Sequence, residues 1–223
     1  MISISKSTCT TLCLALVASV LNIGVVRSQD SQPARPLVIL IGPPLSGKTT
    51  FMTEIQRRYN LPGISVEDLI TEHASELQKK YPKGIPMAEM RYDPAMSRYM
   101  RARLDSTNLS RGVVLDGFPA MRTQAEDLAK MIAQHKLNPI TLQLEIPDDM
   151  VRQRAATGGR QSDRQQIIDQ RIKDYHREFD TLSIYFPSAK IVKINGNQSE
   201  DNVWKAMQEA LDAWGLRPAS KGK

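Results

Sequence analysis

The sequence predicts an α/β fold in which helices cover both faces of a parallel sheet of five strands. Two observations support this prediction. Short apolar runs rich in β-branched residues alternate along the chain with longer segments whose apolar residues recur at helical spacing. The first run, residues 37–41, is apolar throughout, which is typical of a strand buried on both faces. Strands that alternate with helices in this way form parallel sheets covered on both sides.

The first half of the chain supplies three of these strands. The run at 37–41 ends at a glycine, and a helix from about residue 47 follows, because apolar residues then recur at helical spacing. Short apolar runs predict two further strands, at 63–66 and at 112–116. A helix is expected between them, over residues 67–80.

The second half supplies the other two strands and three helices. Residues 140–146 read Ile-Thr-Leu-Gln-Leu-Glu-Ile, and residues 190–194 read Lys-Ile-Val-Lys-Ile, so both predict strands. Helical periodicity predicts helices over 122–134, 163–179 and 200–214.

Two stretches interrupt this alternation. Residues 79–100 are rich in Pro, Met and charge, and residues 155–162 are rich in small and polar residues. We interpret both as insertions over the carboxyl ends of the strands, where open α/β sheets bind their ligands.

The composition fits one globular domain and excludes several kinds of site. The chain has 223 residues, of which 41% are hydrophobic and 24% charged, so it can bury a sizeable core. Both cysteines, Cys9 and Cys13, lie at the start, which excludes a disulfide framework, a thiolate zinc site or a cysteine nucleophile in the domain. The net charge of +6 suits nucleic acid, an acidic membrane surface or a polyanionic small molecule.

The first segment is predicted to be a targeting signal. Residues 1–28 contain no acidic residue, and Lys6 precedes an apolar run that ends in small residues, as in a secretory signal peptide cleaved after Ser28. We therefore expect export, to the periplasm or the medium. An uncleaved membrane anchor and an organelle transit peptide are the alternatives. A linker is expected over 29–36, and a tail over 216–223.

A phosphate-binding loop is the strongest motif. Residues 42–49 read Gly-Pro-Pro-Leu-Ser-Gly-Lys-Thr, between the first predicted strand and the first predicted helix. In such a loop the backbone N–H groups and the helix N-terminus hold a phosphate chain. Lys48 would reach the β- and γ-phosphates, and the hydroxyl of Thr49 would hold Mg²⁺. The motif predicts ATP or GTP binding without naming a reaction.

From about Pro36 to Trp214 the chain resembles the adenylate kinase family of nucleoside monophosphate kinases, nearest to its short-lid members. Four stretches carry the resemblance: residues 42–50, residues 64–70, the Leu-Asp-Gly-Phe-Pro of 115–119 with Gln124, and the arginines Arg154, Arg160 and Arg171.

The resemblance implies a three-layer P-loop NTPase fold over residues 37–215, with an acceptor-side insertion at about 67–105 and a short lid at about 155–162. It also implies Mg²⁺-ATP-dependent phosphorylation of a nucleoside monophosphate, with AMP as the family's default acceptor. We expect a monomer whose partners are small nucleotides, with no nucleic acid and with a membrane only if residues 1–28 stay as an anchor.

The resemblance assigns the donor half of the site residue by residue. The expected catalytic residues are Lys48, Arg154, Arg160 and Arg171. The expected ATP-binding residues are Gly42, Leu45, Ser46, Gly47, Lys48, Thr49, Thr50 and Gly196. Thr49 and Asp116 are expected at Mg²⁺, Asp116 through water. Guanidinium forks suit this work because they bind phosphate oxygens bidentately.

The acceptor half departs from the family's pattern. The expected acceptor-binding positions are Val66, Thr71, Gly117 and Gln124. Thr71 stands where the family has one phosphate-binding arginine, and Ala120 stands where it has the other. A charge-assisted hydrogen bond contributes about 1.5–3 kcal/mol, so two lost forks would weaken acceptor binding strongly.

Three explanations of this departure stay open. Arg91, Arg98, Arg101 or Arg122 could hold the acceptor's phosphate from rebuilt positions. The acceptor could be a different small molecule. The protein could also bind ATP with little or no turnover. A nucleic-acid binder is a further class, but the basic segment 152–173 shows no aromatic interleaving and no known binding module.

Overall fold

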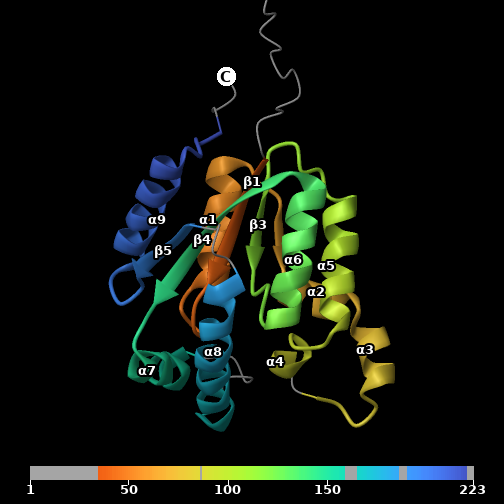
Figure 1. Cartoon of the computed structure of the whole chain (residues 1–223). Coiled ribbons are helices and arrows are strands. Elements are labelled where there is room, and N and C mark those ends of the chain that lie inside the picture. The colour runs from red at the N-terminus through yellow and green to blue at the C-terminus, as the bar shows by residue number, and fades with distance from the viewer. Residues whose placement is uncertain (1–34, 86, 159–164, 186–189, 220–223) are drawn as a thin grey trace, which may run out of the picture. The chain divides into compact units, whose positions relative to one another are not determined.

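Five parallel strands lie side by side in the order β2-β3-β1-β4-β5 (Figure 1). The structure is a computed structural model, and it describes residues 35–85, 87–158, 165–185 and 190–219. The strands are β1 (Arg35–Ile41), β2 (Gly63–Ser65), β3 (Val113–Asp116), β4 (Leu137–Glu145) and β5 (Lys190–Asn195). The predicted five-stranded parallel sheet is confirmed.

The helices of the described residues connect these strands and cover them. They are α1 (Lys48–Tyr59), α2 (Val66–Glu72), α3 (Ala74–Lys80), α4 (Met87–Met90), α5 (Ala95–Ser106), α6 (Arg122–His135), α7 (Asp148–Gly158), α8 (Gln165–Tyr185) and α9 (Glu200–Trp214). No helix among the described residues combines the length and apolarity that crossing a membrane requires.

The central strand β1 contributes to two cores, one on each face of the sheet. Leu37 and Ile39 pack in a cluster with residues of α2, α5 and α6. Val38 and Leu40 pack in a second cluster with residues of α1 and α9. All four side chains are almost completely buried, and each contributes about 1.5–3 kcal/mol by its removal from water. The expected three layers are therefore helix, sheet and helix.

Several predicted bounds are wrong. The helix expected over 67–80 is two helices, because the chain breaks at His73, whose ring stacks on Tyr99 of α5 at a centroid distance of 3.6 Å. β4 begins at Leu137 rather than residue 140, because Leu137 pairs with Arg35 at the start of β1. Helix α8 extends to Tyr185, beyond the expected end at residue 179.

The predicted targeting segment, residues 1–28, lies outside the described residues and stays a prediction. Most of the predicted linker and the last four residues of the predicted tail lie outside them too. Of the predicted lid, residues up to Gly158 continue α7, and residues 159–162 are not described.

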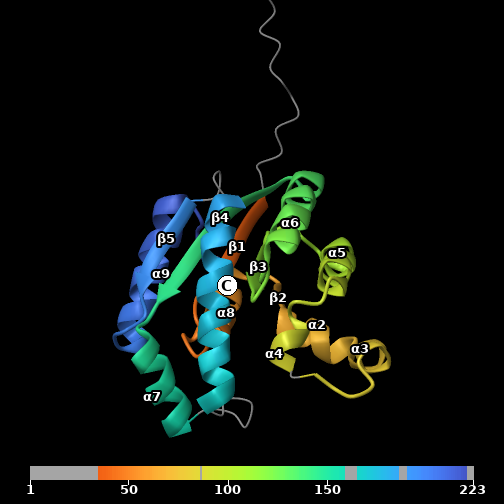
Figure 2. The same ribbon diagram turned by 60° about the horizontal axis from the view of Figure 1, so that its bottom comes forward.

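The predicted acceptor-side insertion corresponds to α2, α3, α4 and α5, which gather next to β2 and away from β5 (Figure 2). The buried carboxylate of Asp93 holds the segments of this region together through hydrogen bonds. Asp93 accepts hydrogen bonds from Lys80 Nζ at 2.7 and 2.9 Å, from Tyr81 Oη at 2.5 Å and from the N–H of Ala95 at 2.7 Å. Burial raises the pKa of Asp93, but these hydrogen bonds outweigh it and hold the pKa below its usual range.

An Asp93→Asn variant is therefore expected to lose about 2–4 kcal/mol of unfolding free energy at pH 7. Because the pKa is lower in the folded state, the carboxylate stabilises the fold above the ordinary carboxyl pKa, and this contribution is lost as the pH falls. The gap between variant and wild type should accordingly shrink below about pH 4. Urea unfolding at pH 7 and at pH 3 measures both effects.

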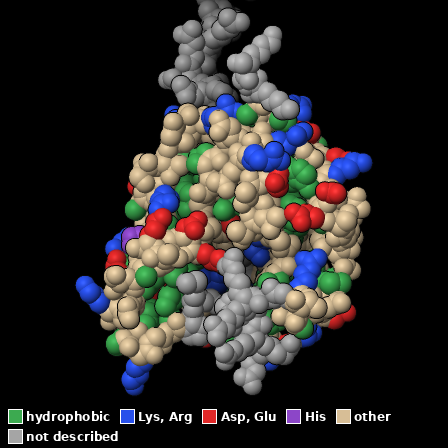
Figure 3. Space-filling model, turned by 180° about the vertical axis from the view of Figure 1, so that it is seen from behind, with side chains coloured by type: hydrophobic (Ala, Val, Ile, Leu, Met, Phe, Trp, Pro, Cys, Tyr) green, Lys and Arg blue, Asp and Glu red, His purple; other side chains and the backbone are tan. Residues whose placement is uncertain are grey.

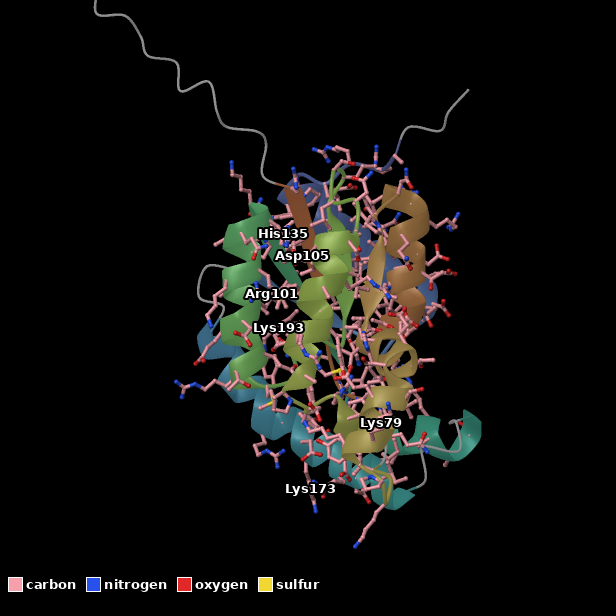
Figure 4. All side chains as sticks on the ribbon, turned by 90° about the vertical axis from the view of Figure 1, so that its right-hand side faces the viewer. Lys79, Arg101, Asp105, His135, Lys173 and Lys193 are labelled. Carbon is pink, nitrogen blue, oxygen red and sulfur yellow. The ribbon has the colours of Figure 1, made fainter. Side chains whose placement is uncertain are left out.

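The matched control is Asp105→Asn on α5, labelled in Figure 4, whose half-exposed carboxylate lies 3.0 Å from His135 Nε2. Because solvent screens the half-exposed carboxylate, its pair with His135 should contribute at most about 1 kcal/mol, and this variant should unfold nearly like wild type. Equal losses in the two variants would contradict an anchoring role for Asp93.

Candidate active site

The loop between β1 and α1 forms the centre of the site. β1 lies between β3 and β4, so its carboxyl end at Ile41 lies in the middle of one edge of the sheet. Gly47 ends the loop with a φ of 93°, a left-handed angle that glycine adopts without strain. Because α1 begins at the next residue, the positive end of its dipole meets the loop. This arrangement suits an anion.

The side chain of Lys48 turns back over the loop. Its Nζ donates to the carbonyl oxygens of Gly42 at 3.0 Å and Pro43 at 2.8 Å, and to Oγ of Ser46 at 3.3 Å. The buried Ser46 and the carbonyl of Gly42, two predicted ATP-binding residues, therefore hold the ammonium group at the loop.

The pKa of Lys48 reflects the charges around it. Burial lowers this pKa to about 8; the carboxylate of Asp116 opposes the shift, and the cations of Arg91 and Arg171 add to it. Three cations (Lys48, Arg91 and Arg171) and two carboxylates (Asp116 and Glu67) thus lie close enough to influence one another electrostatically. A site that holds several phosphate groups needs cations converging in this way.

Thr49 and Asp116 form the part of the site that suits a metal ion. Thr49 Oγ1, in the first turn of α1, donates to Oδ2 of Asp116 at 2.8 Å. Asp116 is buried at the end of β3, where it pairs with Leu40 of β1. A hydroxyl and a carboxylate are hard oxygen ligands of the kind Mg²⁺ prefers. The pair fits an ion that also binds phosphate oxygens.

Arg154 joins α7 to the loop. Its Nη1 donates to the carbonyl oxygen of Leu45 at 2.9 Å, and its Nη2 donates to that of Gly196 at 3.1 Å. Gly196 follows β5, and its own N–H donates to the carbonyl of Glu145 at 2.8 Å. The structure therefore brings three predicted donor-side residues together, from parts of the chain 109 and 42 residues apart. Thr50 is exposed in the first turn of α1.

A cavity of about 280 Å³ opens beside the loop. Gly42 and Lys48 line it from the loop and α1, Gly117 from the segment after β3, and Arg171 from α8. Two predicted catalytic residues, Lys48 and Arg171, therefore share one cavity. The predicted catalytic residue Arg160 lies outside the described residues.

The predicted acceptor residues lie in different surroundings. Gly117 lines the cavity. Val66 is buried in the core at the start of α2. Thr71 is exposed on α2, and its hydroxyl donates to the carbonyl of Glu67 in the same helix at 2.9 Å. Among these three positions, Gly117 alone borders the cavity.

The fourth predicted acceptor residue, Gln124, is completely buried. Its Oε1 accepts from the N–H of Ala120 at 2.8 Å, and its Nε2 donates to the carbonyl of Arg91 at 2.7 Å. Gln124 therefore connects the segment after β3 to the segment that precedes α5.

Of the four arginines considered as replacements for the missing forks, Arg91 lines the cavity. The other three bond to neighbours on helix surfaces: Arg98 to Glu76 (2.5 Å), Arg101 to Gln134 (3.0 Å) and Arg122 to Glu126 (3.0 Å).

One face of α8 lines the cavity with residues that, apart from Arg171, the sequence alone did not assign to the site. Ile167, Gln170, Arg171, Asp174 and Tyr175 all line the cavity. They are spaced as i, i+3, i+4, i+7 and i+8, which places them on a single helical face. Once Arg171 is assigned to the site, this spacing is the signal that identifies its neighbours.

Comparison with known proteins agrees with this geometry. The family model described as adenylate kinase matches residues 40–191. An adenylate kinase of Bacteroides thetaiotaomicron is 32% identical over 184 residues, covering 78% of this chain and 97% of the relative. Adenylate kinases of Corynebacterium urealyticum and Trichodesmium erythraeum are 28% and 27% identical, each over 78% of this chain, and the matches cover 98% and 97% of those relatives.

Proposed function

Since the chain belongs to the adenylate kinase family, we propose that AMP is its acceptor and that Mg²⁺ accompanies its ATP. The chain is a phosphotransferase, an ATP-dependent nucleoside monophosphate kinase. The main observation in support of the proposal is that Lys48, Arg171 and Gly117 line one cavity. It joins the donor loop to the acceptor side, as direct transfer between two nucleotides requires.

The reaction needs no covalent bond to the protein. A phosphate oxygen of the acceptor attacks the γ-phosphorus of ATP, the bond from that phosphorus to the β–γ bridging oxygen breaks, and two nucleoside diphosphates leave. Charge develops on the oxygens of the moving group, so positioning and cations carry the catalysis. Lys48 and the loop would hold the donor phosphates, and Arg171 would meet the transferring group from α8.

Thr49 and Asp116 would hold Mg²⁺, which neutralises charge on the β- and γ-phosphates when bound. Among the described residues no three His, Cys, Asp or Glu side chains cluster as a ready-made metal cage.

A coupled assay of ADP formation tests the proposal, with the 223-residue chain, ATP, Mg²⁺ and each nucleoside monophosphate in turn. We expect acceptor-dependent turnover, fastest with AMP. Turnover with another monophosphate alone would overturn the choice of AMP. ATP binding without acceptor-dependent turnover would favour the second candidate, a nucleotide-binding protein of low activity, which Thr71 and Ala120 at the family's arginine positions make worth testing.

On one face of the molecule, the charge pattern is more typical of a small-molecule site than of a nucleic-acid site. On the face shown in Figure 3, basic and acidic side chains are interspersed. Nucleic-acid sites instead gather Lys and Arg along one stripe or patch.

A further inference from the structure

We propose that Arg91 binds the phosphate group of the acceptor and so replaces the cations that Thr71 and Ala120 do not supply. This inference rests on the proposed function and names the side chain through which the acceptor site works. Its ligand is a phosphomonoester, the chemical class to which every nucleoside monophosphate belongs. Four observations on the described residues support it.

The first observation is the course of the Arg91 side chain across Gly117. Nη2 of Arg91 lies 2.8 Å from the point at which a Cβ on Gly117 would stand. Gly117 also has a φ of 77°, which strains any residue with a side chain. A glycine at this position therefore leaves the space through which the guanidinium reaches the cavity.

The second observation concerns the residues that line the same cavity as Arg91. They include Lys48, Arg171 and Ala120. Lys48 belongs to the donor loop, so the guanidinium lies on the acceptor side of a cavity that the donor loop also borders. A phosphate bound there would be close to the γ-phosphate that it must attack.

The third observation is how firmly the backbone at Arg91 is held. Its carbonyl accepts the 2.7 Å hydrogen bond from the buried Gln124. Two residues further on, the buried Asp93 bonds to Lys80 and Tyr81. A cation on a fixed backbone loses little freedom when a ligand binds, so its hydrogen bonds contribute more to affinity.

The fourth observation concerns the carboxylates near Arg91, of which Asp116 and Glu67 also influence Lys48. Within the described part of the chain, no carboxylate forms an ion pair with Arg91. Of the two carboxylates at the cavity, Asp174 is bonded to Arg177 at 2.8 Å and to Gln170 at 3.0 Å, and Glu89 is exposed on α4. The planar fork of Arg91 is therefore available for two phosphate oxygens.

An Arg91→Ala variant tests the proposal. Loss of one charge-assisted fork is expected to raise the KM for AMP about 10- to 100-fold, while the Kd for ATP stays within about twofold of wild type. Arg91→Lys should fall between the two, because an ammonium group keeps the charge but not the bidentate geometry. Acceptor KM is measured in the coupled assay and ATP Kd by calorimetry.

The double variant Arg91→Ala/Ala120→Arg supplies a guanidinium to the same cavity from another position, and it should recover part of the lost acceptor affinity. Arg101→Ala is the matched control, since Arg101 (Figure 4) bonds to Gln134 outside the cavity, and its acceptor KM should not change. An unchanged acceptor KM in Arg91→Ala, or an equal rise in the Kd for ATP, would overturn the proposal.

Direct calorimetric binding of AMP separates this inference from the proposed function. If wild type shows no turnover with any acceptor yet binds AMP more tightly than Arg91→Ala does, the kinase activity fails and the phosphate site stands. If wild type turns over and both proteins have the same Kd for AMP, the kinase stands and the role of Arg91 is wrong.

Discussion

A Lys48→Met variant is expected to lose about a thousandfold or more in kcat, because it removes the cation at the centre of the phosphate loop. The ammonium group of Lys48 is held by Gly42, Pro43 and Ser46 at the point where the donor phosphates would lie. Methionine has a similar length and no charge, so the substitution removes the electrostatic interaction without adding bulk. The coupled assay at saturating ATP and acceptor measures the loss.

The lowered pKa of Lys48 provides a check that the variant still folds. Because the folded-state pKa of about 8 is below the value in an unfolded chain, protonation of Lys48 opposes folding at neutral pH. Its removal therefore should not reduce stability through charge, and the thermal midpoint should stay close to that of wild type. Lys79→Met, at an exposed position on α3 (Figure 4), is the matched control and should keep full turnover. Full turnover in Lys48→Met would remove the loop from the mechanism.

The phosphate loop was predictable because its determinants are local. An apolar strand, a glycine-bounded loop and a helix follow one another within residues 35–59, and each is dictated by its own residue types. Lys48 opens that helix, and its side chain turns back to donate to Gly42 and Pro43 of the same loop.

The break at His73 could not be predicted because its cause lies elsewhere in the chain. The helical pattern of residues 67–80 is continuous, and no glycine or proline marks a boundary. At the boundary the ring of His73 stacks on Tyr99, which belongs to another helix 26 residues later. Tertiary packing here outweighs local propensity.

The acceptor half was hard to predict for a similar reason. The sequence presents Arg91, Arg98 and Arg101 as equivalent basic residues within the predicted acceptor-side insertion of about 67–105. What separates them is packing: Arg91 reaches the cavity across Gly117, whereas the other two bond to helix surfaces. The approach of Arg91 to Gly117 and the hydrogen bonds of Arg98 and Arg101 all join residues that are far apart in the sequence.

Arg171→Met is expected to lower kcat about a hundred- to a thousandfold while the Kd for ATP changes little. Arg171 lines the cavity from α8, and its charge is near enough to Lys48 to lower the pKa of that lysine. A cation in that place meets the charge that develops on the transferring group, so its effect should appear in kcat rather than in ground-state affinity.

The matched control is Lys173→Met, two residues further along α8, where the side chain is exposed (Figure 4). Both variants remove one positive charge from the same helix, so a general electrostatic effect would lower kcat equally in the two. Only Arg171 borders the cavity, and only its loss should slow the chemical step. Single-turnover kinetics with calorimetric ATP binding separate the two quantities. If the Kd for ATP rises as much as kcat falls, Arg171 binds the donor in the ground state, and its assignment to the transferring group is wrong.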